Sequence, residues 1–187
     1  MSMARLHAGL LAIAIAMAPL CLAGQVPPRP GQATPVPRDW SEGRPLAWVD
    51  FLALPDAASK GAALTTYEIQ ARSICEVDGP AFRVTVRFLP DQSWIKPKQR
   101  TARTLAHEQG HFDLAEVTAR RLRRELASLR LACASGTAAF AKLVADFQYR
   151  DRDLQRSYDR QTMYGVSAGP QRQWGEKIKS WLRTEKP

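Results

Sequence analysis

The sequence predicts an α+β fold, with a small antiparallel sheet followed by a layer of helices. Apolar and polar residues alternate from Phe82 to Phe88, which is the pattern of a strand with one buried face. Beyond Pro97 the apolar residues recur at steps of three and four, which is typical of amphipathic helices. Because the strand patterns come first and the helical patterns follow, we expect α+β.

The strand region is predicted to contain an antiparallel pair. Thr65–Ile74 carries the β-branched and aromatic residues that strands prefer, and Asp78-Gly79-Pro80 offers a turn before the strand at Phe82–Phe88. The short apolar run Trp48–Leu54 is interpreted as a further strand. The Phe82–Phe88 strand either lies at an edge, where an extended peptide would pair with it, or is a central strand that is already paired.

Three helices are predicted. The first begins after Pro97 and ends near Cys133, ahead of a Ser-Gly break, and it is expected to pack on the second and on the C-terminal helix. The second covers Phe140–Tyr158, and Pro170 opens the third. The apolar stripe of the first helix contains Leu105, Glu108, Phe112, Ala115, Ala119, Leu122, Leu126 and Leu129.

The chain is predicted to be exported. Residues 1–23 resemble a cleaved signal peptide, because the apolar run Leu10–Leu22 is too short to span a bilayer comfortably; an uncleaved anchor is the alternative. Residues 24–45 are rich in proline and are interpreted as a linker. Residues 46–187 then form one domain, which we expect in the periplasm or outside the cell, with no stable membrane span after signal removal.

Two cysteines, Cys75 and Cys133, remain after signal removal. In an oxidising compartment such a pair predicts one structural disulfide, and two buried free thiols are the alternative. Neither cysteine belongs to a CxxC pair, so a metal site built on cysteine is not expected.

The net charge of +9 points to anionic envelope polymers as partners rather than to nucleic acid. The basic cluster at residues 120–124 has no interleaved aromatic residues and matches no nucleic-acid-binding motif, so it is interpreted as a solvated helix face.

The stretch His107-Glu108-Gln109-Gly110-His111 is the chemically informative motif. On a helix, His107 and His111 lie one turn apart on the same side, where two imidazoles are able to share one zinc ion. Glu108 would act as general base for an activated water. The alternative is a chance match, which is rare in a chain of this length and rarer in a helical context.

A third zinc ligand is needed, and no other histidine remains after signal removal. Glu116 points almost opposite the two histidines on a continuous helix, and Asp113 is also turned away; both are expected to pair with arginines or to face solvent. Asp151, a lone carboxylate on an apolar stripe, either reaches the metal from the second helix or faces a groove.

The segment LAHEQGHFDLAEVTARRLRREL resembles the signature of an uncharacterised bacterial family, the domain-of-unknown-function group numbered nine-two-two, described as predicted secreted zinc-dependent proteases. The pieces WVDF, SWIK, YDRQTMYG and QRQW match in the same order. The resemblance implies zinc peptidase chemistry, with His107 and His111 as ligands and Glu108 as base. It also draws attention to Tyr158, Asp159 and Thr162, and it departs at Tyr164, where the family tends to carry histidine.

We therefore expect an exported zinc metallohydrolase that acts on peptides or proteins in the cell envelope. Asp159 is the preferred third ligand, with Asp151, Tyr164 and Glu116 as alternatives, and Tyr164 is a candidate donor to an oxyanion. One alternative is a metal-binding or cationic envelope scaffold protein with no turnover, and another is a basic adhesin-like module that binds anionic wall polymers.

Overall fold

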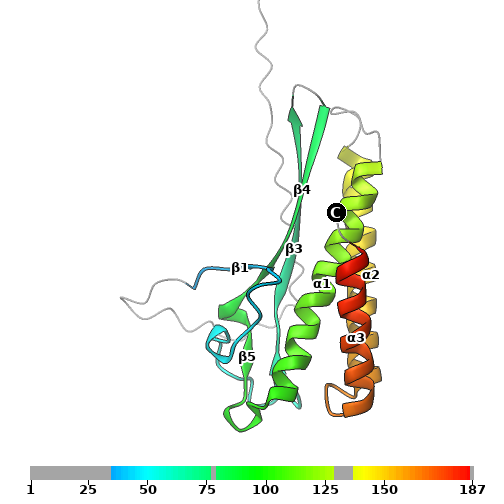
Figure 1. Ribbon diagram of the computed structural model, residues 1–187. Helices are drawn as coiled ribbons and strands as arrows, with labels where there is room; N and C mark the ends of the chain where they lie inside the picture. The colour runs from blue at the N-terminus through cyan, green and yellow to red at the C-terminus, as the bar shows by residue number, and fades with distance from the viewer. Residues whose placement is uncertain (1–34, 77–78, 129–136, 186–187) are drawn as a thin grey trace, which may run out of the picture. The chain divides into compact units, whose positions relative to one another are not determined.

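The computed structural model describes residues 35–76, 79–128 and 137–185, and it confirms the α+β class. The strands are β1 (Arg38–Asp39), β2 (Ala63–Leu64), β3 (Tyr67–Glu76), β4 (Gly79–Phe88) and β5 (Trp94–Ile95). The helices are α1 (Ala102–Ser128), α2 (Thr137–Thr162) and α3 (Ala168–Thr184). In Figure 1 the β3–β4 hairpin runs beside α1, and α2 and α3 also contact α1.

The larger sheet has the order β1-β4-β3, and both pairings are antiparallel. The predicted antiparallel pair is thus confirmed, although Gly79 and Pro80 belong to β4 rather than to a turn. β4 lies between β1 and β3, but β1 pairs only with Arg87 and Phe88 of β4, so in the described chain the rest of that edge of β4 carries no neighbouring strand. β1 lies within the proline-rich segment that the sequence suggested to be a linker. A second, two-stranded sheet pairs β2 with β5.

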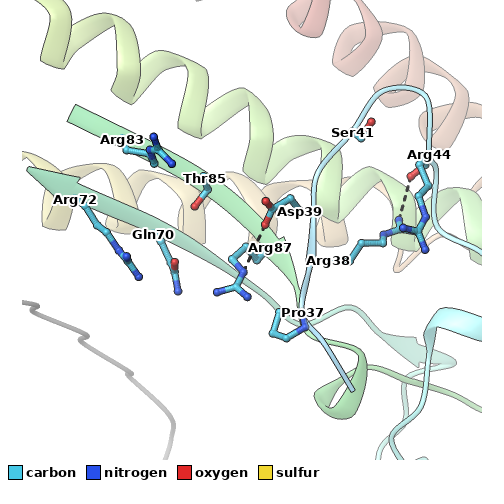
Figure 2. A pocket seen from close by; sticks show the side chains of 10 residues that line it. All are labelled: Pro37, Arg38, Asp39, Ser41, Arg44, Gln70, Arg72, Arg83, Thr85 and Arg87. Carbon is cyan, nitrogen blue, oxygen red and sulfur yellow. Dashed lines mark hydrogen bonds and ion pairs between the residues drawn. The ribbon is translucent and has the colours of Figure 1, made fainter. Parts of the chain in front are cut away.

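The two faces of the larger sheet differ in polarity, as the alternation along β4 requires. Val84, Val86 and Phe88 are buried and belong to the same core cluster as the apolar residues of α1. The ring of Phe88 meets that of Phe112 edge to face, with centroids 5.8 Å apart. The other face carries mainly arginines and uncharged polar side chains (Figure 2).

Helix α1 is buried on two sides, because it contacts the sheet as well as α2 and α3. Its residues Phe112, Ala115, Ala119, Leu122 and Leu126 join the sheet core. On the other side, Leu114 of α1 packs with Tyr158, Trp174 and Ile178 of the other two helices.

Two predictions were wrong, one about the secondary structure after Ala47 and one about the exposure of Arg120. The run from Trp48 begins with a 3₁₀ helix, Trp48–Asp50, because Asp50 accepts a hydrogen bond from the Ala47 backbone and pairs with Arg38. Arg120, expected in a solvated helix face, is buried: it is hydrogen-bonded to Glu116 and to the carbonyl of Leu182.

Some predictions fall outside the described part of the chain. Cys133 and the predicted end of the first helix lie in residues 129–136, and the side chain of Cys75 is also not described, so the disulfide stays a prediction. Among the described residues, no helix has both the length and the apolarity needed to cross a membrane.

The side chain of Tyr158 on α2 lies directly against Gly110 of α1, and this contact gives a test of the packing. A Cβ at this position would lie 2.8 Å from Cζ of Tyr158 and closer still to its hydroxyl oxygen. We expect Gly110→Ala to lower the free energy of unfolding by about 1–3 kcal/mol through overpacking, measured by chemical denaturation. Gly175→Ala on α3, where nothing lies within 4 Å of the new Cβ, is the control and should stabilise by about 0.5–1 kcal/mol. Equal effects of the two substitutions would contradict this account of the interface.

Candidate metal centre

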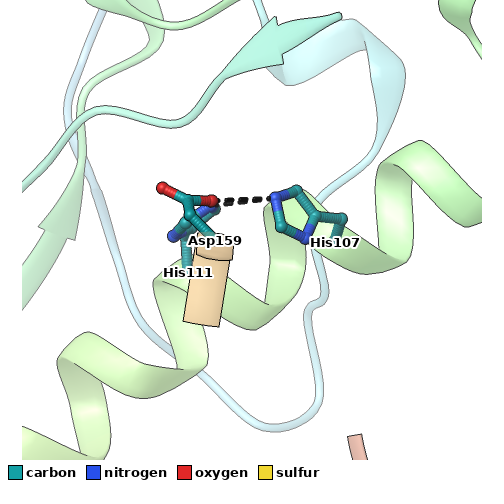
Figure 3. Close-up of side chains that lie close together, drawn as sticks. All are labelled: His107, His111 and Asp159. Carbon is teal, nitrogen blue, oxygen red and sulfur yellow. Dashed lines mark hydrogen bonds and ion pairs between the residues drawn. The ribbon is translucent and has the colours of Figure 1, made fainter. Parts of the chain in front are cut away.

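His107 and His111 of α1 and Asp159 of α2 converge on one point (Figure 3). Oδ1 of Asp159 lies 3.2 Å from Nε2 of His107 and 3.1 Å from Nε2 of His111. The two Nε2 atoms are 3.2 Å apart. These separations resemble those of ligands that sit about 2.0–2.1 Å from one tetrahedral zinc ion, which places them about 3.3–3.4 Å from one another.

These three residues are the one group of histidine and acidic side chains, within the described part of the chain, whose ligand atoms all lie within 4.8 Å of one another. The sequence favours Asp159 as the third ligand, and the structure brings Asp159, but neither Asp151 nor Glu116, into the group.

The amide of Gln155, on α2, orients the imidazole of His111. Its Nε2 donates to the backbone carbonyl of His111 at 3.0 Å, so its Oε1 faces Nδ1 of the same histidine at 2.7 Å. An amide oxygen only accepts hydrogen bonds. Nδ1 of His111 therefore carries a proton, and Nε2 is left to face Asp159.

The amide of Gln171, on α3, orients the imidazole of His107 in the same way. The buried phenol of Tyr158 donates to the His107 carbonyl at 3.2 Å, and burial raises the pKa of Tyr158 well above its usual value, so the phenol stays protonated. Its oxygen then accepts the Nε2 amide of Gln171 at 2.6 Å, which turns Oε1 of Gln171 towards Nδ1 of His107 at 3.1 Å. His107 is thereby held in the same tautomer as His111.

As a result, two imidazole lone pairs and a carboxylate oxygen converge, and such a group needs a cation. Burial opposes ionisation of Asp159, but the hydrogen bonds that Nε2 of His107 and His111 donate when the rings are protonated, together with the charges of these rings, outweigh it, so the pKa of Asp159 is lowered well below its usual value. Burial likewise opposes protonation of His111, yet Asp159 and Glu108 raise the pKa of His111. A proton satisfies the group when no metal is bound, and a divalent cation of matching size fits the same donors.

Glu108 lies beside this group and is buried, with 4% of its surface exposed. Its Oε2 accepts a hydrogen bond of 2.7 Å from the hydroxyl of Thr65, which precedes β3. The negative charge of Glu108 contributes to the raised pKa of His111, so the carboxylate acts on the metal-ligand group at short range. No pattern in the sequence identifies Thr65 as the partner of Glu108.

The other acidic candidates have partners of their own. Asp151 accepts hydrogen bonds from Tyr67 and Thr118, and burial raises its pKa. Asp113 binds the indole of Trp40 and the amide of Gln109, rather than an arginine or solvent. Glu116 pairs with two arginines of its own helix, as expected from its position on the helix; they are Arg120 and Arg123.

Tyr164 lies in a tight turn at the rim of the site. Met163, Tyr164 and Gly165 have φ values of 51°, 55° and 80°, a left-handed run that non-glycine residues seldom adopt. Gly165 faces the His107 ring so closely that a Cβ would lie 2.8 Å from its Cγ. The Tyr164 side chain is 69% exposed, and its hydroxyl makes no hydrogen bond to the residues that the structure describes.

Thr162 stabilises this turn, because its hydroxyl donates to the carbonyl of Tyr158 and accepts the amide of Gly165. Gln155 and Gln171 were missed by the sequence reasoning. A signal for Gln155 existed, since it lies one helical turn from both Asp151 and Asp159. Gln171 lies in the QRQW piece that the family resemblance had singled out.

Comparison with known proteins adds one finding. Among curated proteins and among solved structures, none matches the chain. The sequence profile of a family described as bacterial protein of unknown function (DUF922) matches residues 54–165, which is more than half of the chain and includes the motif helix and Asp159. The chain therefore belongs to the DUF922 family.

Proposed function

We propose that this protein is a zinc-dependent hydrolase, and that its substrates are peptides or proteins. The observation that carries the proposal is the convergence of His107, His111 and Asp159 with both histidines held so that Nε2 faces the common point. Two imidazoles and one carboxylate are a ligand set that suits zinc.

The openness of the site supports a catalytic rather than a structural ion. Catalytic zinc sites have three protein ligands and keep a further position for water or substrate, whereas structural sites are closed by four. The described chain supplies three ligands here, and the side chain of Asp159 is 28% exposed, so the group is accessible from the side of α2.

Zinc bound to these ligands would polarise a scissile carbonyl and lower the pKa of a water molecule. Glu108, oriented by Thr65, would accept the proton of that water and deliver it to the leaving amine. The exposed hydroxyl of Tyr164 is the proposed donor to the oxyanion, in the turn that packs against His107. Because residues 1–23 are predicted to be an export signal, we propose that this chemistry takes place in the periplasm or outside the cell.

A metal-binding protein without turnover is the second candidate, and one observation favours it. Glu108 is almost fully buried and its Oε2 is already engaged by Thr65, which leaves less of the carboxylate for a reacting water. Removal of the Glu108 charge should slow peptide cleavage by a hydrolase, whereas a protein without turnover has no cleavage to lose.

Metal binding is tested first. We expect purified protein to hold about one zinc per chain, removable with a chelator, and we expect His107→Ala and His111→Ala to lose it because each removes a ligand. Asp159→Asn keeps an oxygen but loses the charge, so zinc binding should weaken markedly. Asp153→Asn, an exposed carboxylate on the same helix, is the matched control and should retain zinc. Zinc content is measured by elemental analysis. Retention of zinc by the double histidine variant would refute the site.

The amide network gives a second expectation. Gln155→Leu and Gln171→Leu leave all three ligands in place but remove the acceptors for both Nδ1 protons. We expect zinc affinity to fall about 10–100-fold in each variant, as for other groups that orient metal-bound histidines. Competition with a fluorescent chelator measures the affinity. The control is Gln173→Leu, an exposed amide on α3, which should bind zinc like the parent chain. Unchanged affinity in both network variants would contradict the assigned tautomers.

Glu108→Gln separates the two candidate functions. The substitution keeps the shape and the acceptor for Thr65 but removes the charge, so zinc should stay bound. If the protein is a hydrolase, cleavage of a peptide library should slow by about 10²–10⁴-fold, because general-base catalysis is lost. Cleavage that is equally fast in the variant would point to a contaminating peptidase and would overturn the assignment of Glu108.

A further inference from the structure

The outer face of the β1-β4-β3 sheet holds a groove that the metal centre does not use. It has a volume of about 560 Å³ and is formed by β1, the loop after it and the outward-facing residues of β3 and β4 (Figure 2). Ten residues line it, and five of them are arginines: Arg38, Arg44, Arg72, Arg83 and Arg87.

Two of these arginines face each other without compensation. Arg72 of β3 and Arg83 of β4 are directly opposite in the strand register, and both are exposed. Like charges in this position destabilise a sheet. Among the side chains that the structure describes, neither has an ion-pair partner, whereas Arg87 lies 3.5 Å from Asp39 and 3.4 Å from Glu68.

The rest of the chain offers little charge that would neutralise this pair. Residues 1–34 contain no aspartate or glutamate. Outside the described side chains the chain has three carboxylates, those of Glu76, Asp78 and the C-terminus. The net charge of +9 is in keeping with a surplus of arginine on this face.

We propose that this groove binds an acidic polysaccharide whose charges are carboxylates. Guanidinium groups bind carboxylates through paired, charge-assisted hydrogen bonds, and Arg72 and Arg83 present two such groups side by side. Gln70 and Thr85 form the next cross-strand pair and offer hydrogen bonds to sugar hydroxyls. Arg87 follows one pair further on, but Asp39 and Glu68 already neutralise it, so the unpaired positive charge of the groove lies at Arg72 and Arg83.

The lining disfavours two other polyanions. None of the described residues that line the groove is aromatic, so they offer nucleic-acid bases no stacking platform. The groove lies on the face of the sheet, where side chains rather than unpaired backbone groups are presented, so an acidic peptide would not gain strand pairing there. Because the groove faces away from α1, its binding is independent of the proposed metal centre.

Binding of polygalacturonate to the full chain tests this proposal, by isothermal titration at low salt. We expect the double variant Arg72→Gln/Arg83→Gln to bind at least about tenfold more weakly, since two charge-assisted contacts are lost. The control Arg100→Gln/Arg183→Gln removes the same charge from two exposed positions outside the groove. It should change the affinity less than about twofold if binding depends on the groove rather than on the net charge of the protein. Thermal unfolding should show both double variants folded, and a chelator should leave binding unchanged.

Equal weakening in the two double variants would overturn the proposal, because it would show attraction to net charge alone. Dextran of the same length, which is neutral, should not bind. Poly-glutamate and a single-stranded oligonucleotide of matched charge should bind more weakly than polygalacturonate. Tighter binding of either one, with the same dependence on Arg72 and Arg83, would assign the groove to that other class of polymer and refute a polysaccharide partner.

Discussion

The contact between Gly110 of α1 and the ring of Tyr158 on α2 determines how the side chains of the candidate metal centre are arranged. Because Gly110 has no side chain, the phenol sits against α1, fully buried, and its ring stacks on His107 with centroids 4.7 Å apart. Asp159 is the next residue along α2, so the same contact carries its carboxylate to the two histidines. The phenol hydroxyl in turn fixes Gln171 of α3. One close helix approach thus aligns side chains from three helices.

This alignment explains why a buried polar layer is tolerated between the helices. Each donor and acceptor around His107 and His111 has a partner: the amides bind Nδ1, the phenol binds a carbonyl, and Thr65 binds Glu108. A buried polar network costs stability only where it is incompletely satisfied. The three ligand atoms are the exception, since they repel one another unless a cation lies among them.

The sequence predicted the elements better than the contacts between them. The alternation in β4 and the three-and-four spacing of α1 each reflect burial on one face, so both elements could be predicted from short stretches of sequence. The spacing of His107 and His111 likewise predicts that they lie on the same side of the helix. Helical phase also excluded Glu116. The choice between Asp151 and Asp159 depends on how α2 rotates against α1, and Tyr67 and Thr118 decide it by binding Asp151. No local pattern encodes such partners, and the same holds for Thr65, which is distant from Glu108 in sequence.

Helix α3 completes the surroundings of the candidate metal site, although it lies outside the segment that the family profile matches. The family profile stops at Gly165, before α3 begins, yet Gln171 and Trp174 of that helix complete the surroundings of His107 and Tyr158. A fragment trimmed to the matched residues would keep every metal ligand while exposing the rings that hold them. The segment that the family profile matches therefore ends before the packed structure does. The folding unit extends at least to Thr184.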